Sequence, residues 1–252
     1  MKLLLKISYL GTHFCGYQIQ KDKRTVQGEL NRAALELFGH ECDVTGCSRT
    51  DSGVHANEFC ATITDKGGDT LTTDIDISKI PRALSAHLPD DISVRFAEWR
   101  SSEFHPRYDV RYKEYIYRIY NSPIRDPFEE GRALHVPVLI DDGALALMSS
   151  AASAFVGKFD FSSFMASGSS VESTVREVFY ADVHREGDII VFRVAADGFL
   201  YNMVRIMAGT LLSVAQGKIT PDMIGDIIAA HSRERAGMTL APHGLYLNRV
   251  VY

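Results

Sequence analysis

The sequence has few cysteines and no long apolar run. Four cysteines in 252 residues are too few for the disulfide framework of a small secreted domain. No stretch approaches the roughly 20 apolar residues that a membrane-spanning helix needs. The first residues, MKLLLKISYLG, hold only three consecutive leucines before Lys6, and no small-residue cleavage site follows. We therefore read residue 1 as a mature N-terminus and expect a cytoplasmic protein.

Close pairs of metal-ligating residues are also missing. Cys42, Cys47 and Cys60 lie on both sides of His55 in the sequence, and this makes a zinc site one possible interpretation. Their spacing argues against it, because structural zinc sites usually contain pairs such as C-x2-C. We expect small, mostly buried thiols and no metal.

Basic residues are not in excess. The formal net charge is −5, whereas nucleic-acid-binding domains are often strongly basic. A local basic cleft is compatible with this total, because the opposite face of the protein can be acidic. Basic and aromatic residues are mixed most densely in FHPRYDVRYKEYIYRIY, residues 104–120. Those residues are Arg107, Arg111, Lys113, Arg118, Tyr108, Tyr112, Tyr115, Tyr117 and Tyr120.

Hydrophobic periodicity predicts alternating strands and helices in the first hundred residues. Strands are expected over 2–9, 58–65 and 91–99, and helices over 25–39 and 74–89. In the first helix Thr25 is the expected N-cap and Gly39 the expected end. In the strand over 91–99 we expect Ile92, Val94 and Phe96 to face inward.

The remainder of the chain has a similar pattern. Strands are expected over 110–120 and 244–252, and a hairpin over 175–196 with its turn near Glu186-Gly187. A helix over 141–157 has Asp141 or Asp142 as its cap, an apolar helix over 198–218 ends at Gly217, and Thr220-Pro221 begins another.

This order of elements indicates the fold class. Strands and helices occur in both halves in a β-α-β-β-α-like order, and many strands look hairpin-connected. We therefore predict an α+β protein of two sandwich-like halves sharing a sheet, rather than a doubly wound parallel fold. No low-complexity linker separates the halves. The predicted domains are residues 1–104 and 105–252.

Three features of the sequence are candidates for chemistry. The first is GCSRTDSGVHA, residues 46–56, where Arg49 and Asp51 lie in a Gly-containing loop; it could equally be a plain polar turn with a solvated ion pair. The second is Tyr115 with Tyr117 on one face of a strand, for which ordinary core packing is the alternative. The third is Arg205, among apolar helical neighbours, which needs a carboxylate partner unless its head group reaches solvent.

Six segments carry a resemblance that covers nearly the whole chain. They are YLGTHFCGYQIQ (9–20), GCSRTDSGVHA (46–56), FHPRYDVRYKEYIYRI (104–119), FDFSSF (159–164), NMVRIMAGTL (202–211) and GLYL (244–247). In this order they resemble the A-type family of tRNA pseudouridine synthases, which isomerise uridine in the anticodon stem-loop of transfer RNA. The RTDxGVHA form is specific to that family, whereas GLYL alone would be weak.

The resemblance implies a fold, partners and roles. It implies the pseudouridine synthase fold, with two tandem ferredoxin-like or RRM-like halves joined through a central antiparallel or mixed sheet and a cleft between them. It also implies a homodimer, no cofactor, and action on uridines at positions 38, 39 and 40 of tRNA. Asp51 matches the catalytic aspartate and Arg49 the arginine two positions before it. Tyr115 matches the active-site tyrosine, and Arg205 the arginine that pairs with the aspartate.

The sequence departs from the family pattern in two places. Ser52 replaces the more usual alanine after the aspartate, a small change with little expected effect. ASGSSVESTVREV, residues 166–178, lacks the cysteine common before its TxR segment, which puts the RNA contacts of that loop in question.

The implied chemistry accounts for these residue types. The reaction breaks the bond from C1′ to N1 of uracil, turns the base and rejoins it through C5. A carboxylate can begin it by attacking the base or sugar, or by removing a sugar proton. An arginine partner such as Arg205 favours the ionised carboxylate. An aromatic ring such as that of Tyr115 can stack on the flipped base, and Arg49 can contact phosphate or the gap left by the extruded nucleotide.

Two other classes of function are weighed against this one. A non-catalytic RNA-binding protein would use the basic and aromatic strand, but it has no use for Asp51 beside it, because a carboxylate repels phosphate. An RNA hydrolase using Asp51 and His55 would need a second carboxylate or a set of metal ligands, and the sequence shows neither at suitable spacing.

Overall fold

The computed structural model describes residues 1–168 and 171–252 and divides into two compact units. Unit 1 comprises Met1–Arg111 and Leu247–Tyr252, and unit 2 comprises Tyr112–Tyr246. The last strand therefore begins in unit 2 and ends in unit 1.

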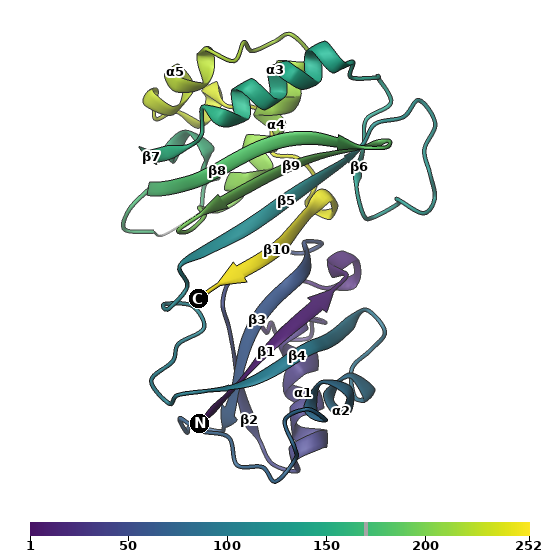
Figure 1. The fold of residues 1–252 in the computed structure, drawn as a ribbon, viewed down its shortest axis with the longest axis vertical. Coiled ribbons are helices and arrows are strands. Elements are labelled where there is room, and N and C mark those ends of the chain that lie inside the picture. Colours follow the sequence, from purple (N-terminus) through teal and green to yellow (C-terminus); the bar gives the residue numbers. More distant parts are fainter. Residues whose placement is uncertain (169–170) are drawn as a thin grey trace. The chain divides into compact units, whose positions relative to one another are not determined.

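Unit 1 is an antiparallel sheet with two helices (Figure 1). β1 pairs with β3 and β4, and β2 pairs with β3, all antiparallel. The order along the chain is β-α-β-β-α-β, the ferredoxin-like pattern that the family resemblance implies. The elements are β1 (Lys2–Tyr9), α1 (Val26–Phe38), β2 (Cys42–Gly46), β3 (His55–Asp65), α2 (Ile80–Ala86) and β4 (Ile92–Arg100).

Helix α1 begins and ends where the sequence predicts. The Thr25 hydroxyl accepts a hydrogen bond from the Gly28 N–H at 3.2 Å, and Gly39 ends the helix in the left-handed conformation with φ 76°. The buried side of the helix consists of Val26, Leu30, Ala33 and Ala34.

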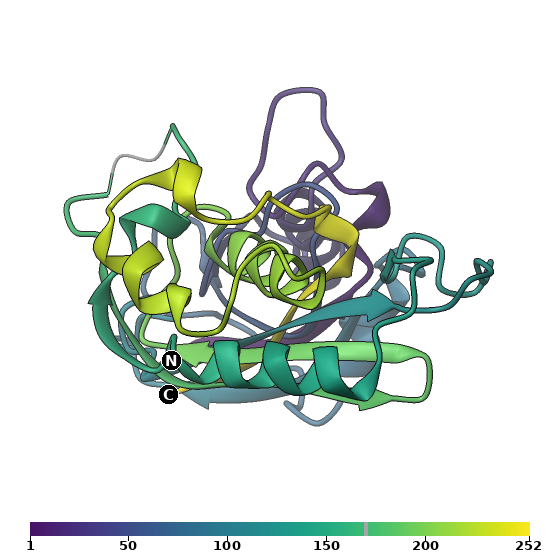
Figure 2. The ribbon, with the colours of Figure 1, turned by 90° about the horizontal axis from the view of Figure 1, so that it is seen from above.

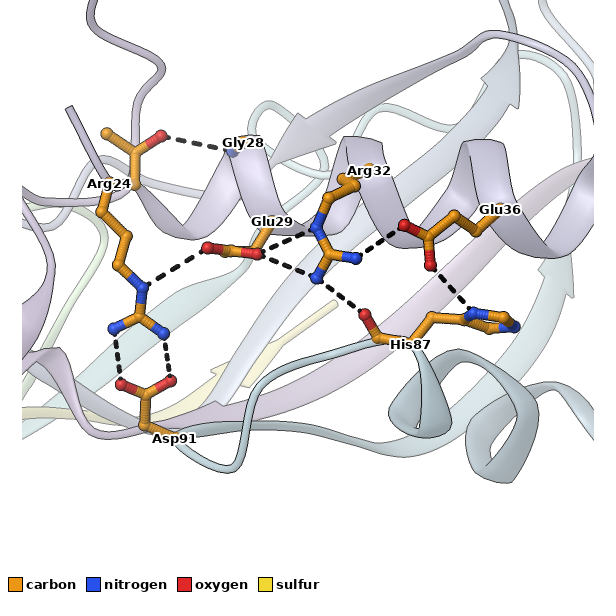
Figure 3. Close-up of polar contacts among 8 residues, drawn as sticks. Arg24, Gly28, Glu29, Arg32, Glu36, His87 and Asp91 are labelled. Carbon is orange, nitrogen blue, oxygen red and sulfur yellow. Dashed lines mark hydrogen bonds and ion pairs between the residues drawn. The ribbon is translucent and has the colours of Figure 1, made fainter. Parts of the chain in front are cut away.

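The exposed side of α1 carries a chain of ion pairs (Figure 3). Arg24, just before the helix, makes two hydrogen bonds of 2.8 Å to the Asp91 carboxylate. Arg32 lies between Glu29 and Glu36, and its guanidinium also donates to the His87 carbonyl at 2.8 Å. Arg32 lowers the pKa of the Glu36 carboxyl. Each exposed pair contributes little alone, but together they join α1 to the segment after α2.

Three details of unit 1 differ from the sequence prediction, and the first is strand β2 (Cys42–Gly46), which was not predicted. Phe96 is 46% exposed, so the prediction that it faces inward with Ile92 and Val94 is wrong. The cause is a bulge, because Ile7 pairs with Val94 whereas Lys6 pairs with Phe96, and an extra residue reverses the alternation of faces. Helix α2 is also shorter than predicted, since it begins only at Ile80.

Unit 2 has the strand order β5-β9-β8-β7. Its pairings are antiparallel, except that β6 joins β5 in parallel. Helices α3 and α4 pack against each other, and α3 lies along β8, as Figure 2 also shows. The elements are β5 (Tyr112–Tyr120), β6 (Leu134–His135), α3 (Asp142–Ser153), β7 (Gly157–Asp160), β8 (Val175–Glu186), β9 (Ile189–Ala196), α4 (Met203–Ala215) and α5 (Met223–Ala229). Strand β10 (Leu245–Val251) begins in unit 2 and ends in unit 1.

Local sequence signals also explain where α3 begins and where the chain turns between β8 and β9. The Asp141 carboxylate caps α3 by accepting from the Ala144 N–H at 2.7 Å, and Gly187, with φ 59°, turns the hairpin between β8 and β9. Helix α4 begins only at Met203, because Asn202 before it has φ 61°. These features confirm the α+β class. Among the described residues, no helix combines the length and apolar character needed to cross a membrane.

Replacing Thr25 with Ala should lower the free energy of unfolding by about 1 kcal/mol, because the buried first turn of α1 loses its capping oxygen. Thr25→Ser keeps that oxygen and should recover most of the loss. Urea unfolding followed by circular dichroism measures both. Equal stability of Thr25→Ala and the unmodified protein would contradict the capping role.

Candidate active site

The loop between β2 and β3, residues 47–54, presents the candidate catalytic carboxylate. Asp51 is half-buried, Arg49 is exposed and Thr50 between them is buried. The Val54 N–H donates to the Asp51 carbonyl at 3.1 Å, and Gly53 in this turn has φ 79°, a value that other residues rarely adopt. The segment is therefore a shaped turn, and Asp51 stands at its start.

Thr50 is held on both its side chain and its backbone by the segment 9–20. The Tyr9 and Thr50 hydroxyls are hydrogen-bonded at 2.8 Å, and the Tyr17 N–H donates to the Thr50 carbonyl at 3.0 Å. One residue beyond Asp51, the Ser52 hydroxyl donates to the Phe14 carbonyl at 3.1 Å. Asp51 is thus flanked on each side by a residue bonded to the same segment.

Two glycines of the segment 9–20 allow its backbone to lie close to the backbone of the loop 47–54. A Cβ at Gly11 would lie 1.9 Å from the Val54 carbonyl oxygen, and one at Gly16 would lie 2.8 Å from the Thr50 carbonyl oxygen. The Gly11 N–H also donates to Nδ1 of His55 at 2.9 Å. His55 is completely buried, so this nitrogen has a structural role and is not placed to serve as a general base. That geometry disfavours the hydrolase interpretation.

Strand β5 in unit 2 carries the candidate tyrosine. Tyr115 is 7% exposed and packs edge-on against the ring of Phe199, with centroids 5.0 Å apart. Tyr117 is fully buried, and its hydroxyl donates to the Ala241 carbonyl at 2.7 Å. Burial raises the pKa of Tyr117. Tyr117 therefore belongs to the core of unit 2.

Arg205 lies in the first turn of α4 and is half-buried. Its Nε donates to the Leu240 carbonyl at 2.7 Å, and its Nη1 donates to Oδ1 of Asn202 at 2.6 Å. These two bonds fix the plane of the guanidinium. Asn202, the acceptor of one of them, is the residue in the left-handed conformation that precedes the helix.

The four predicted site residues divide between the units. Asp51 and Arg49 lie in unit 1, and Tyr115 and Arg205 lie in unit 2. Reasoning from the sequence missed the residues that hold them: Thr50, Tyr9, Gly11, Phe199 and Asn202. Only a weak signal was available for four of them: Thr50, Tyr9 and Gly11 lie within the segments 9–20 and 46–56 of the family resemblance, and Asn202 lies within the segment 202–211.

The cysteines are packed as small apolar side chains. Cys42, Cys47 and Cys60 are buried, and burial raises the pKa of the Cys42 thiol to about 11. Within residues 1–168 and 171–252, no group of three or more His, Cys, Asp or Glu side chains could hold a metal ion.

Comparison with known proteins matches the chain to one family. A family model described as tRNA pseudouridine synthase matches residues 6–109 and 151–252. Proteins named tRNA pseudouridine synthase A are 42% identical in Ruminiclostridium cellulolyticum, over 100% of this chain and 99% of that protein, and in Acetivibrio thermocellus, over 98% of both. The Bacillus licheniformis protein of that name is also 42% identical, over 100% of this chain and 99% of its own length.

Replacing Gly11 with Ala should destabilise the protein by roughly 1–3 kcal/mol, because the new methyl group overlaps the Val54 carbonyl at the end of the candidate loop. Gly67→Ala is the control: its backbone has a positive φ that strains alanine, but nothing lies within 4 Å of the added Cβ. It should therefore lose less free energy of unfolding than Gly11→Ala. Thermal and urea unfolding of both variants test this; a smaller loss at Gly11 than at Gly67 would refute the close approach.

Proposed function

Because the chain belongs to the tRNA pseudouridine synthase family, we propose that it acts on uridines 38, 39 and 40 in the anticodon stem-loop. It is an isomerase that converts uridine in tRNA to pseudouridine. The observation that carries the assignment is the full-length match, which includes the RTDSGVHA loop with Asp51 at its turn.

In this proposal Asp51 is the catalytic residue. Its carboxylate starts the cleavage of the bond between C1′ and N1, either by adding to the base or sugar or by removing a sugar proton. The uracil turns, C5 forms the new bond to C1′, and the proton that C5 loses is balanced by one gained at N1. Atoms are conserved, so the RNA keeps its mass. The hydrogen bonds of Thr50 and Ser52 support this role because they restrict where the carboxylate can lie.

The other three residues act on the substrate or on Asp51. Tyr115 stacks on the flipped uracil, and its contact with Phe199 supports this role by holding the ring in one orientation. Arg205 keeps the carboxylate of Asp51 ionised, and its two hydrogen bonds within unit 2 support a fixed guanidinium. Arg49, exposed on the loop, contacts the RNA backbone or the space left by the extruded nucleotide.

The proposal extends to the assembly and location of the protein. We propose that it works in the cytoplasm as a homodimer, that it needs no cofactor, and that the two domains carry the two parts of the site. These extensions are what membership of the family implies, and the similarity to curated relatives over their whole length supports that membership.

Asp51→Asn should bind tRNA with nearly unchanged affinity and form no detectable pseudouridine, because the substitution removes the charge and keeps the shape. Asp43→Asn, a half-buried aspartate on β2 in the same unit, is the matched control and should stay active. Pseudouridine is mapped in unmodified tRNA, and mass spectrometry should show no change in RNA mass. Turnover of Asp51→Asn within tenfold of the unmodified protein would remove Asp51 from this role; a gain of one water by the RNA would indicate hydrolysis.

Tyr115→Phe should keep much more activity than Tyr115→Leu if stacking is the main role of the ring, because Phe retains the aromatic face. Comparable, large losses in both would instead assign the hydroxyl to removal of the C5 proton. Single-turnover rates at saturating enzyme measure this. Near-normal rates in both variants would show that Tyr115 does not contact the base.

A further inference from the structure

The turn between β4 and β5 exposes an aromatic ring that the proposed function leaves without a role. Tyr108 is 75% exposed, although its neighbours Phe104 and Pro106 are buried. A single exposed aromatic residue is ordinary on a protein surface. Tyr108 differs from such a residue because hydrogen bonds fix its turn and because His105 and Arg107 lie beside its ring.

The turn is rigid because it is bonded internally. The Asp109 carboxylate accepts from the His105 N–H at 2.9 Å, and the His105 carbonyl accepts from the Asp109 N–H at 3.1 Å. Nδ1 of the His105 ring accepts from the Arg107 N–H at 3.1 Å. Three hydrogen bonds within five residues thus fix the backbone on both sides of Tyr108.

The turn is also attached to the C-terminal end of the chain, within unit 1. The Tyr252 hydroxyl donates to the Pro106 carbonyl at 2.9 Å, and the Tyr252 ring packs edge-on against Phe104 at 4.9 Å between centroids. The Arg111 N–H donates to the Val251 carbonyl at 2.8 Å. A ring presented on so fixed a turn loses little conformational entropy when it binds a partner.

Cationic and aromatic groups surround the ring. The His105 and Tyr108 rings lie 4.2 Å apart between centroids at an interplanar angle of 32°. The guanidinium carbon of Arg107 is 5.9 Å from the Tyr108 centroid, and both Arg107 and Arg111 are exposed. Proteins that bind single-stranded nucleic acid combine these features: an aromatic face for a base and arginines for the adjoining phosphates.

We propose that Tyr108, backed by His105 and flanked by Arg107, is a stacking platform for an unpaired nucleotide of the tRNA substrate. This platform rests on the proposed function for its ligand, but it is separate from the residues assigned to catalysis. It contributes affinity for tRNA and leaves the chemical step unchanged.

The charges of the turn favour RNA over an acidic protein surface or a purely apolar partner. The carboxylate of the acidic neighbour Asp109 accepts a backbone hydrogen bond from His105 and is held within the turn. The ring brings an exposed face and the arginines bring donors for phosphate oxygens. An acidic partner protein would use the arginines but would not require the aromatic face.

Binding is measured in the Asp51→Asn background, which prevents turnover, by fluorescence anisotropy with end-labelled unmodified tRNA at several salt concentrations. Tyr108→Ala should weaken binding about tenfold, and Tyr108→Phe should stay within about twofold. Arg107→Ala should also weaken binding and lower the slope of log affinity against log salt by about one, whereas Tyr108→Ala should leave that slope unchanged. Phe96→Ala, which removes an exposed ring on β4, is the matched control and should bind normally.

A second measurement does not depend on loss of affinity. Tyr108→Trp combined with Trp99→Phe places the only tryptophan at the platform, and tRNA binding should quench its fluorescence by stacking. Normal affinity of Tyr108→Ala, or absence of quenching in the tryptophan variant, overturns the platform. These outcomes are distinct from failure of the proposed function, which would appear as absence of pseudouridine formation by the unmodified protein.

Discussion

The candidate catalytic loop depends on one close approach between two backbone segments. Residues 9–20 lie against residues 47–54, and only glycine at position 11 permits it, since a Cβ there would be 1.9 Å from the Val54 carbonyl oxygen. The hydrogen bonds to Thr50 and Ser52 follow from that contact. A loop held in this way can carry a carboxylate in one fixed position, and this is what catalysis by a single charged group requires.

Local patterns in the sequence predicted most elements of the fold, because their causes are local. The Thr25 cap, the Gly39 terminus and the Gly187 turn each depend on residues within one turn of chain. The inward direction predicted for Phe96 was wrong, because the bulge depends on how β4 pairs with β1. The late start of α4 likewise comes from the left-handed conformation of Asn202, which periodicity does not reveal.

The sequence names candidate site residues but not the contacts that hold them. Asp51, Arg49, Tyr115 and Arg205 were found through family motifs, which record residue types at fixed spacing. Their supporting contacts join residues distant in sequence, such as Tyr9 with Thr50 and Arg205 with Leu240. Only the folded chain defines such pairs. The burial of His55, which removes it from the candidate bases, has the same nonlocal origin.

Net charge was a poor guide to RNA recognition for a physical reason. Several arginines are bonded to carboxylates of the protein itself, as Arg24 is to Asp91 and Arg32 to Glu29 and Glu36. The total charge counts paired and unpaired side chains alike, so it does not measure how many cations are available to phosphate. The field that a phosphate meets depends instead on where the exposed charges lie. A total of −5 is therefore compatible with an RNA substrate, because the phosphates meet only the local field and stacking adds affinity that does not depend on charge.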